Sequence, residues 1–246
     1  MTDSADHETK RGTTVEAAVD VLRRAITGAR FAPGQRLVSR ELEEELGIGR
    51  GSLREAFRRL AADGLIELTP NRGASVRRFT RAEIIDVFPI RERIEGLAAH
   101  LAAARIHLDD NRATFEAVWA AVGGERTGAS ALTFMEDNRA LHRTIVRLSG
   151  NPHLGELIER LALPVMMVQL RHLMTHNDID ASGREHATIA AAILAGDAMA
   201  AEGAMRRHLR QSLCRLMELP DTDFMPLRLG AEPAERDTPP LPPRRN

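Results

Sequence analysis

Arginine side chains recur at four-residue intervals in the segment RGSLREAFRRLAAD, a spacing that could bind a polyanion. Arg50, Arg54 and Arg58 share one face of a helix predicted over residues 50–63. A guanidinium can bind the O6 and N7 atoms of guanine in the major groove, or a phosphate oxygen. The opposite face of the helix is apolar, with Leu53, Ala56, Phe57 and Leu60. A helix that packs on its domain through the apolar face presents the arginines to a partner.

A short β-hairpin is predicted directly after this helix. Residues 65–69 and 74–77 read as strands around a turn in which Gly73 permits a positive φ. Arg72 and Gly73 at the tip can reach the DNA backbone or the minor groove. A helix followed by such a hairpin is typical of a winged helix-turn-helix, so double-stranded DNA is the expected partner.

Charge is distributed unevenly along the chain. The net charge of the 246 residues is −1, so the chain as a whole is not a polycation. Between residues 47 and 81, however, eight arginines stand against three acidic residues. This local excess favours a surface for a polyanion. The alternative for any arginine cluster is a solvated helix face, which stays open for Arg58, whereas Arg59 is expected to pair with acids of its own domain.

Histidines in the second half of the chain form another candidate site. Asn138 and His142 lie one turn apart on a predicted helix, and His186 lies near the beginning of the next-to-last helix. His208 lies on the apolar side of the last helix. Three imidazoles and one oxygen ligand inside a helical bundle could hold Zn, Ni or Mn. Spacing alone leaves open that these are ordinary hydrogen-bonded core histidines.

The composition indicates which elements must position these side chains. Aromatic residues make up only 3% of the chain and tyrosine is absent, so small and aliphatic side chains must fill the core, which suits packed helices. The single cysteine, Cys214, excludes an internal disulfide framework and fits a reducing compartment. No apolar run approaches the roughly 20 residues that span a membrane, and no signal peptide is visible. We therefore expect a mainly α-helical, cytoplasmic protein with no membrane partner.

Four segments are predicted from the order of these patterns. Residues 1–12 are polar and are expected to be a disordered tail. Residues 13–78 form the winged helix-turn-helix with its small hairpin, and residues 81–219 form an antiparallel all-helical bundle. Residues 221–246 are rich in proline and are expected to be a second disordered tail.

Capping residues set the expected helix boundaries. Ser39 is the predicted N-cap of a short helix that ends at Leu46, before Gly47. Thr80 and Glu83 form a capping-box pattern at the beginning of a long helix that continues to about residue 104. Later helices are predicted over residues 109–122, 130–149, 152–174, 182–195 and 198–219.

The first of the two domains resembles the winged helix-turn-helix of GntR-type bacterial transcription regulators. The resemblance extends from Val15 to Val76, and its motifs occur in the family's order: Ile26-x-Gly28, Pro33-Gly34-x-x-Leu37, Glu41-Leu42, Leu46-Gly47, Arg50-x-x-Leu53-Arg54-Glu55-Ala56, Arg59-Leu60, Asp63-Gly64-Leu65 and Asn71-Arg72-Gly73-Ala74. It implies DNA contacts from Arg40, Arg50, Ser52 and Arg54, with Gly73 at the wing tip. The family usually has Ser or Thr before the Arg50 position, whereas this chain has Gly49, which leaves more of the affinity to the arginines.

Residues 82–219 resemble the FCD ligand-binding domain of the FadR subfamily of these regulators. The shared motifs are Arg91-x-x-Ile94-Glu95, Asn138-x-x-x-His142, Ser149-Gly150-Asn151-Pro152, Glu185-His186, Ala192-Ile193-x-x-Gly196-Asp197 and Met205-x-x-His208-Leu209. The resemblance implies a divalent metal held by His142, His186 and His208 that anchors a small carboxylate effector. The first ligand position, usually Asp, holds Asn138, whose amide oxygen is a poorer ligand.

Arg91 is the best candidate for holding the carboxylate of such an effector, because a guanidinium can bind it with two parallel hydrogen bonds. Its alternative role is a salt bridge to Glu95, one helical turn later.

Two functions follow from these sites. The first is a transcriptional regulator, expected to be a repressor, that binds an inverted-repeat operator as a homodimer and responds to a small carboxylate. The alternative is a metal-dependent enzyme that uses His142, His186 and His208. The sequence has no HExxH run and no nucleophile elbow, so we expect that the protein is not an enzyme.

Overall fold

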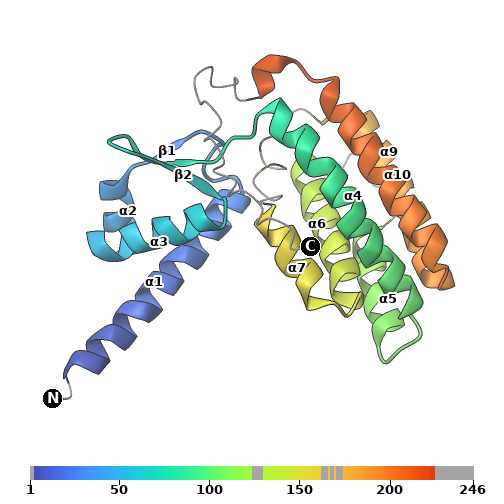
Figure 1. The fold of residues 1–246 in the computed structure, drawn as a ribbon, viewed down its shortest axis with the longest axis horizontal. Coiled ribbons are helices and arrows are strands. Elements are labelled where there is room, and N and C mark those ends of the chain that lie inside the picture. Colours follow the sequence, from blue (N-terminus) through green and yellow to red (C-terminus); the bar gives the residue numbers. More distant parts are fainter. Residues whose placement is uncertain (1–2, 124–129, 162–165, 167–168, 170–173, 225–246) are drawn as a thin grey trace, which may run out of the picture.

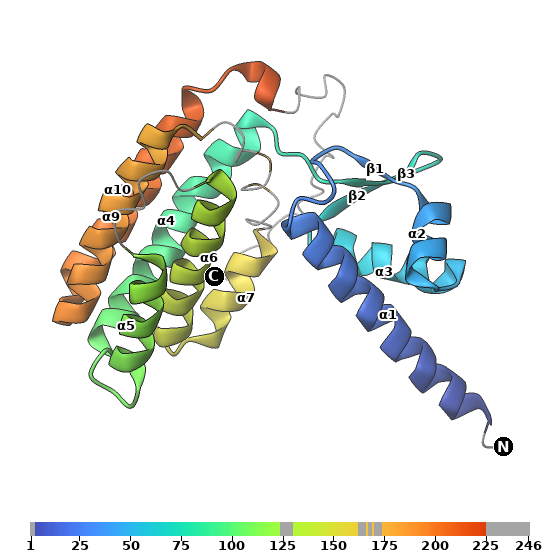
Figure 2. The same ribbon diagram turned by 180° about the vertical axis from the view of Figure 1, so that it is seen from behind.

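The computed structural model describes residues 3–123, 130–161, 166, 169 and 174–224, and within them the chain is mainly α-helical. Figures 1 and 2 show two domains joined by a single strand-to-helix connection near residue 80. The expected fold class is confirmed, with a three-stranded antiparallel sheet in the first domain and packed helices in the second. Within the described residues, no helix combines the length and the apolar character needed to cross a membrane.

The first domain contains three helices and a small sheet. Its elements are α1 (Asp3–Thr27), β1 (Arg36–Leu37), α2 (Ser39–Leu46), α3 (Arg50–Ala62), β2 (Ile66–Thr69) and β3 (Gly73–Val76). The predicted hairpin is confirmed, because β2 pairs antiparallel with β3 from Ile66 opposite Val76 to Thr69 opposite Gly73. Strand β1 was not predicted; it adds to the free edge of β3, with the sheet order β1-β3-β2.

Helix α3 is held by the apolar stripe that the sequence predicts. The four stripe residues are at most 5% exposed, and α3 packs mainly on α1, α2 and β2. Burying one large apolar side chain contributes about 1.5–3 kcal/mol, so this stripe fixes which face of α3 turns outward. The helix begins after Gly49 without a side-chain cap. The preceding helix ends, as expected, at Gly47 in the left-handed conformation with φ of 62°.

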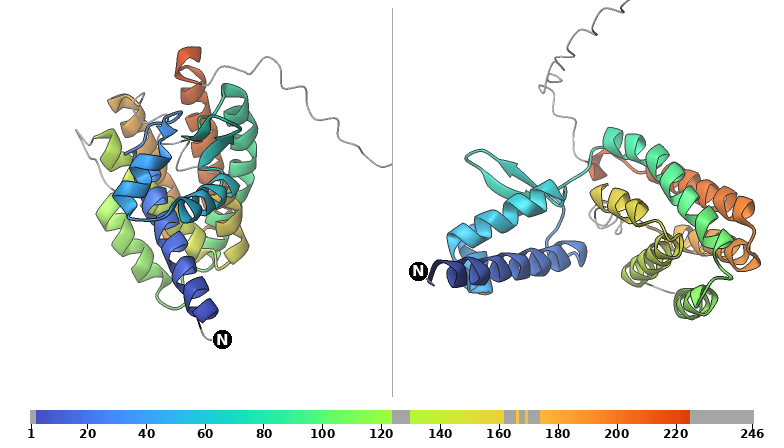
Figure 3. Two further views of the ribbon diagram at one scale, coloured as in Figure 1. Left: turned by 90° about the vertical axis from the view of Figure 1, so that its left-hand side faces the viewer. Right: turned by 60° about the horizontal axis from the view of Figure 1, so that its bottom comes forward.

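The expected N-terminal tail is wrong for residues 3–12, because α1 already begins at Asp3 (Figure 3). Periodicity of apolar residues detects only the part of a helix that has a buried face. The polar residues that precede it include Glu, Lys and Arg, which favour a helix as strongly as leucine does. A second correction concerns Ser39, which is the first residue of α2; Val38 holds the N-cap position, and no side chain caps the helix.

The second domain is a bundle arranged around one long helix. Its elements are α4 (Arg81–Ala104), α5 (Asn111–Val122), α6 (Ala131–Leu148), α7 (Pro152–Arg160), α9 (His176–Ala195) and α10 (Ala198–Met217), followed by the 3-10 turn η2 (Asp221–Asp223). Helix α4 packs against α6, α7, α9 and α10. Its predicted capping box is confirmed, with Thr80 and Glu83 bonded reciprocally. The buried face of α4 carries alanines at 98, 99, 102 and 103, and such small side chains let neighbouring helices approach closely.

Helix α9 begins earlier than predicted. It starts at His176 with a capping box between Thr175 and Asp178, whereas the sequence predicts a helix that begins at Ser182. Ser182 instead lies inside α9 with 3% exposure. Thr175 and Ser182 are each followed three positions later by an acid, and Thr175 is the residue that caps the helix. The predicted helix over residues 152–174 extends beyond the described residues.

The two domains share one hydrophobic cluster. Phe79 and Phe88 lie in the same buried cluster as the stripe of α3, and so does Phe224 at 2% exposure. The expected C-terminal tail is therefore wrong for residues 221–224, where one aromatic side chain finds a buried place between the domains. The rest of that predicted tail, residues 225–246, lies outside the described residues.

Candidate metal centre and nucleic-acid interface

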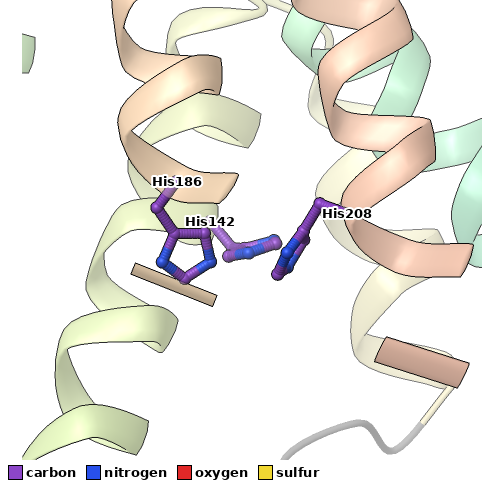
Figure 4. Close-up of side chains that lie close together, drawn as sticks. All are labelled: His142, His186 and His208. Carbon is purple, nitrogen blue, oxygen red and sulfur yellow. The ribbon is translucent and has the colours of Figure 1, made fainter. Parts of the chain in front are cut away.

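Three histidines from three helices meet inside the second domain. His142 comes from α6, His186 from α9 and His208 from α10, and Figure 4 shows their rings turned toward one another. One nitrogen of each ring lies within 4.8 Å of a nitrogen of the other two. The ring centroids of His186 and His208 are 4.6 Å apart, and each is 5.4 Å from that of His142. The predicted convergence of these histidines is therefore confirmed.

The first supporting carboxylate is Glu95 of α4. It is 3% exposed, and its Oε2 accepts a hydrogen bond from Nδ1 of His142 over 2.6 Å. Its Oε1 accepts a hydrogen bond from Nε of Arg91 over 2.8 Å. Burial alone would raise the pKa of the Glu95 carboxyl, but Arg91 and His142 outweigh it and hold that pKa well below its usual range.

The second supporting carboxylate is Glu185 of α9. Its Oε2 accepts a hydrogen bond from Nδ1 of His208 over 2.7 Å. Arg215 binds the same carboxylate with two hydrogen bonds of 2.8 and 3.0 Å. Burial raises the pKa of Glu185, but the hydrogen bonds from His208 and Arg215 lower it overall. Two hydrogen-bonded relays thus end at the histidine cluster. They are Arg91–Glu95–His142 and Arg215–Glu185–His208.

The relays decide which ring nitrogen is free. An ionised carboxylate only accepts, so Nδ1 of His142 and of His208 carries the hydrogen, and Nε2 keeps its lone pair. Nε2 of His142 and Nε2 of His186 are buried and have no hydrogen-bond partner among the described residues. Buried polar atoms are nearly always paired. Two unpaired imidazole nitrogens beside a third histidine are a donor set that suits a divalent metal.

The protonation of the cluster also fits a metal. Burial lowers the pKa of His208 to about 4, although the hydrogen bond to Glu185 acts in the opposite direction. Burial likewise holds the pKa of His186 well below its usual value, and the neighbouring His208 and His142 add to the effect. Both rings are therefore neutral at pH 7, which is the form that binds metals.

A small cavity of about 70 Å³ adjoins His208. Two candidates from the sequence line it: Asn138, one turn before His142, and Arg91. Arg91 is 6% exposed and forms the salt bridge to Glu95, so the alternative role predicted for it is present in the structure. The polar lining is completed by residues of α9 and α10, namely Asp178, Ser182, Ser212 and Arg215.

Sequence reasoning missed Glu95, Glu185 and Arg215 as parts of this centre. Glu95 and Glu185 stand in the motifs of the family resemblance, but Glu95 was considered only as a salt-bridge partner of Arg91, and Glu185 was given no role. A buried position for an acid on an otherwise apolar helix face was the available signal for Glu95. Arg215 offered no such signal, because its partner lies 30 positions earlier in the chain.

The predicted nucleic-acid interface lies on the outer face of α3. Arg50 and Arg54 are exposed and make no ion pair with a described residue, whereas Ser52 is half-buried. Arg40 of α2 is exposed as well, with a 3.2 Å contact to Glu44 on its own helix. The outer face of α3 is thus open to a partner.

The neighbouring arginines of α3 behave differently. Arg58 forms an ion pair with Glu55, three residues earlier on the helix. The pairing predicted for Arg59 is confirmed, with Glu16 at 3.9 Å and Glu55 at 3.8 Å. Among the described residues, the arginines of α3 without an ion-pair partner are therefore Arg50 and Arg54, in the first half of the helix.

The hairpin tip has the predicted conformation. Gly73 has a φ of 85°, and Asn71 also has a positive φ of 62°. Arg72 and Gly73 are exposed. Figures 1 and 2 show that the β2–β3 turn and the α2–α3 end of the domain point to the same side, away from the helical bundle. A partner docked on α3 can therefore reach the wing.

The sequence matches two family models. The model of bacterial regulatory proteins of the gntR family matches residues 14–76, and the model of the FCD domain matches residues 86–211. The chain is 31% identical over 212 residues to the probable D-xylose utilization operon transcriptional repressor of Paenarthrobacter nicotinovorans, a match that covers 84% of this chain and 90% of that protein. The HTH-type transcriptional repressor GlaR of Escherichia coli (strain K12) is 28% identical over 195 residues, covering 76% and 89% of the two chains.

Solved structures show the same fold. The E. coli McbR/YncC structure matches with a TM-score of 0.71 at 21% identity and covers 83% of this chain and 97% of that one. A putative GntR transcriptional regulator from Rhodococcus sp. RHA1 matches with a TM-score of 0.70 at 20% identity, covering 85% and 99%. Together with the family models, these matches explain the exposed arginines of α3 and the helical domain behind them. The chain belongs to the GntR family of bacterial regulatory proteins, carries the FCD domain expected of the FadR subfamily, and is a DNA-binding transcriptional regulator rather than an enzyme.

Proposed function

We propose that the protein is a repressor whose binding to an operator is controlled by a small carboxylate, held in the helical domain through a divalent metal. The observation that carries the control site is that the buried Nε2 atoms of His142 and His186 have no hydrogen-bond partner in the part of the chain that the structure describes. The relatives named as repressors support the direction of regulation.

The DNA-binding surface is assigned to α2, α3 and the wing. Arg50 and Arg54 contact base edges or phosphates in the major groove; both are exposed, and neither forms an ion pair with another described residue. The remaining contacts come from the residues around them: Arg40 and Ser52 on the helices, and Arg72 and Gly73 at the wing tip. A homodimer presents two such surfaces to an inverted repeat.

The metal is assigned to His142, His186 and His208, with Asn138 as the fourth candidate ligand. Zn, Ni and Mn all fit imidazole and oxygen donors. When bound, the metal supplies a positive centre that attracts one oxygen of a carboxylate. The chain supplies the rest: Glu95 and Glu185 fix two of the imidazole rings, and Arg91 lines the cavity beside them.

Arg91 contributes to the effector site through its position rather than as a free cation. Its Nε is bonded to Glu95, and its Cζ lies 4.7 Å from the ring centre of Phe88. A guanidinium has five donor hydrogens, so one bond to Glu95 leaves others for an effector carboxylate. The salt bridge and the effector contact are therefore compatible.

Control of DNA binding follows from thermodynamic linkage. An effector that prefers one arrangement of the two domains changes operator affinity, and the operator changes effector affinity by the same factor. For a repressor released by its effector, each weakens the binding of the other.

The proposal is tested by two measurements on the full chain. The first selects duplexes from a random DNA pool and measures their affinity at increasing salt. A steep linear fall of log affinity with log salt is expected, since arginines displace counterions from phosphates. A failure to enrich any sequence would contradict the DNA-binding assignment.

The second measurement addresses the effector. Thermal unfolding is followed with a panel of small carboxylates, with added Zn²⁺ and with a chelator. A carboxylate that raises the unfolding temperature only when Zn²⁺ is present supports the proposal, because a ligand stabilises the state that binds it. Stabilisation that is equal in chelator would remove the metal from the proposal.

A further inference from the structure

The first residue of α4 is held by the C-terminal end of α10. Nε of Arg81 lies 2.7 Å from Oδ1 of Asp221, and one terminal nitrogen donates to the carbonyl oxygen of Met217 over 2.9 Å. The other terminal nitrogen donates to the carbonyl oxygen of Leu219. The guanidinium carbon also lies 4.4 Å from the ring centre of Phe224. We call these five residues the linker clamp; Figure 1 shows the end of α10 and η2 beside the beginning of α4.

The residues just before Arg81 are held by the same domain. The side-chain amide of Gln169 accepts a hydrogen bond from the backbone N–H of Phe79 over 2.7 Å and donates to its carbonyl oxygen over 3.0 Å. Arg78 donates to the carbonyl oxygen of Thr222 over 3.1 Å. The connection that carries the DNA-binding domain is therefore fixed by groups of the helical domain on both sides.

The clamp shares one residue, Leu219, with the cavity beside the histidine cluster. Leu219 lines that cavity, while its backbone carbonyl accepts the bond from Arg81. Leu216 and Arg215 line the same cavity one turn earlier on α10. Arg215 in turn binds Glu185, which accepts the hydrogen bond of His208. A continuous chain of contacts thus joins the histidine cluster and the cavity to the last turn of α10.

The last carbonyls of a helix have no partner within the helix and must be satisfied elsewhere. At the end of α10 the guanidinium of Arg81 does so, with the geometry of charge-assisted hydrogen bonds. Such bonds depend on direction, so a rotation or shift of the last turn of α10 breaks them rather than stretching them. The contacts of Arg81 therefore favour the position that this turn has in the structure.

We propose that the linker clamp is the element through which the state of the metal and effector site sets the position of the DNA-binding domain. This inference rests on the proposed function and names its coupling device. Arg81 is a positioning residue: it contacts neither DNA nor the metal site, and it links the helix end that senses the site to the helix that begins the connection. With Arg81 removed, both binding sites remain, but they no longer influence each other.

The test uses the full chain, Zn²⁺ alone as the probe for the histidine site, and an operator selected by the parent protein from random duplexes. Operator affinity is measured in Zn²⁺ and in chelator for the parent, for Arg81→Gln and for Arg210→Gln. Arg210 is a matched control, because it also joins α10 to α4 through Glu92, with bonds of 2.6 and 2.9 Å, but lies away from the connection. Zinc content and operator binding are measured separately for each variant.

For the parent and Arg210→Gln, Zn²⁺ is expected to change operator affinity by about fivefold or more, a typical size for coupled sites. For Arg81→Gln the zinc-dependent change in operator affinity is expected to fall to less than about twofold. The variant is still expected to bind the operator, and to bind as much zinc per chain as the parent. Hydrogen exchange provides a second readout that needs no DNA. Zn²⁺ is expected to slow exchange of the backbone amides in residues 78–84 of the parent, and to have no effect there in Arg81→Gln.

An equal zinc dependence in the parent and in Arg81→Gln would overturn the inference. A parent that binds both Zn²⁺ and operator, yet shows no zinc dependence of operator affinity, would overturn it as well. A parent that binds no Zn²⁺ or selects no operator would instead overturn the proposed function, and the inference with it. Separate binding measurements for each site keep these results distinguishable.

Discussion

Glu95 and His142 are joined by a 2.6 Å hydrogen bond although 47 positions separate them in the chain. The carboxylate belongs to α4 and the imidazole to α6, and the bond fixes the ring so that Nε2 faces the other histidines. Arg91 holds the second oxygen of Glu95. An acid that is not itself a candidate metal ligand thereby determines the orientation of one that is.

Glu95→Gln is expected to weaken Zn²⁺ binding by about 10–100-fold, the usual cost of losing such a support. The amide is neutral, so it no longer increases the basicity of the His142 ring. Competition with a fluorescent chelator measures the affinity. Glu92→Gln is the matched control, since Glu92 lies on the same helix but binds Arg206 and Arg210. Equal zinc affinity in both variants would show that the relay has no influence on the site.

His186→Ala is expected to lower the zinc content of the purified protein and to remove stabilisation by any metal-dependent carboxylate. The variant loses one of the three candidate nitrogen ligands, the buried Nε2 of His186, which has no hydrogen-bond partner among the residues described. Elemental analysis measures the zinc content. His176→Ala lies on the same helix with an exposed side chain and should keep the zinc. The assignment of His186 fails if the two variants carry equal amounts.

Without metal, the protein is expected to lose stability as the pH falls from 6.5 to 4. In the folded chain burial lowers the pKa of His208 to about 4, whereas an unfolded histidine titrates near 6.5. Within this window the unfolded chain binds a proton that the folded chain does not, so acid favours unfolding. This difference between the folded and the unfolded pKa of His208 lowers the free energy of unfolding by about 3 kcal/mol between pH 6.5 and pH 4.

Urea unfolding in chelator at several pH values checks this expectation. His208→Gln should show a shallower loss of stability between pH 6.5 and 4 than the parent. His107→Gln is a control with an exposed side chain and should follow the parent. Parallel curves for all three proteins would show that the buried ring of His208 does not resist protonation.

Arg54→Ala is expected to weaken operator binding while the fold stays intact. The expected loss is about 1–3 kcal/mol for each contact between an Arg54 guanidinium and a guanine base. Arg54 is exposed and has no ion-pair partner among the described residues, so its guanidinium is available. Arg58→Ala removes a neighbouring arginine that is already paired with Glu55, and a smaller effect is expected. Titration of a labelled operator at moderate salt compares them. Unchanged affinity in Arg54→Ala would contradict the assigned reading face.

The DNA-binding domain could be predicted closely because its signals are local. The apolar stripe of α3 sets its buried face, and Gly47 and Gly73 mark positions that need a positive φ. Strand β1 escaped prediction because two residues carry no periodic pattern, and only the edge of β3 makes them a strand.

The ends of the chain were predicted less well, for a related reason. Polar composition suggested a tail before Thr13 and after Pro220, but α1 begins at Asp3 and Phe224 is buried between the domains. Composition reports whether a segment can form a core by itself. It does not report whether another part of the molecule offers that segment a surface.

The sequence by itself determined the helices, the arginine face of α3 and the presence of His142, His186 and His208 on helical faces. Helical periodicity relates residues within one or two turns, so these features depend only on residues that are close together in the sequence. Only the tertiary structure decided that the three rings meet, that Glu95 and Glu185 choose their free nitrogens, and that Arg81 joins the end of α10 to the connection. These contacts join residues that are at least 22 positions apart, as His186 and His208 are, and their geometry depends on how helices pack, which no local pattern encodes.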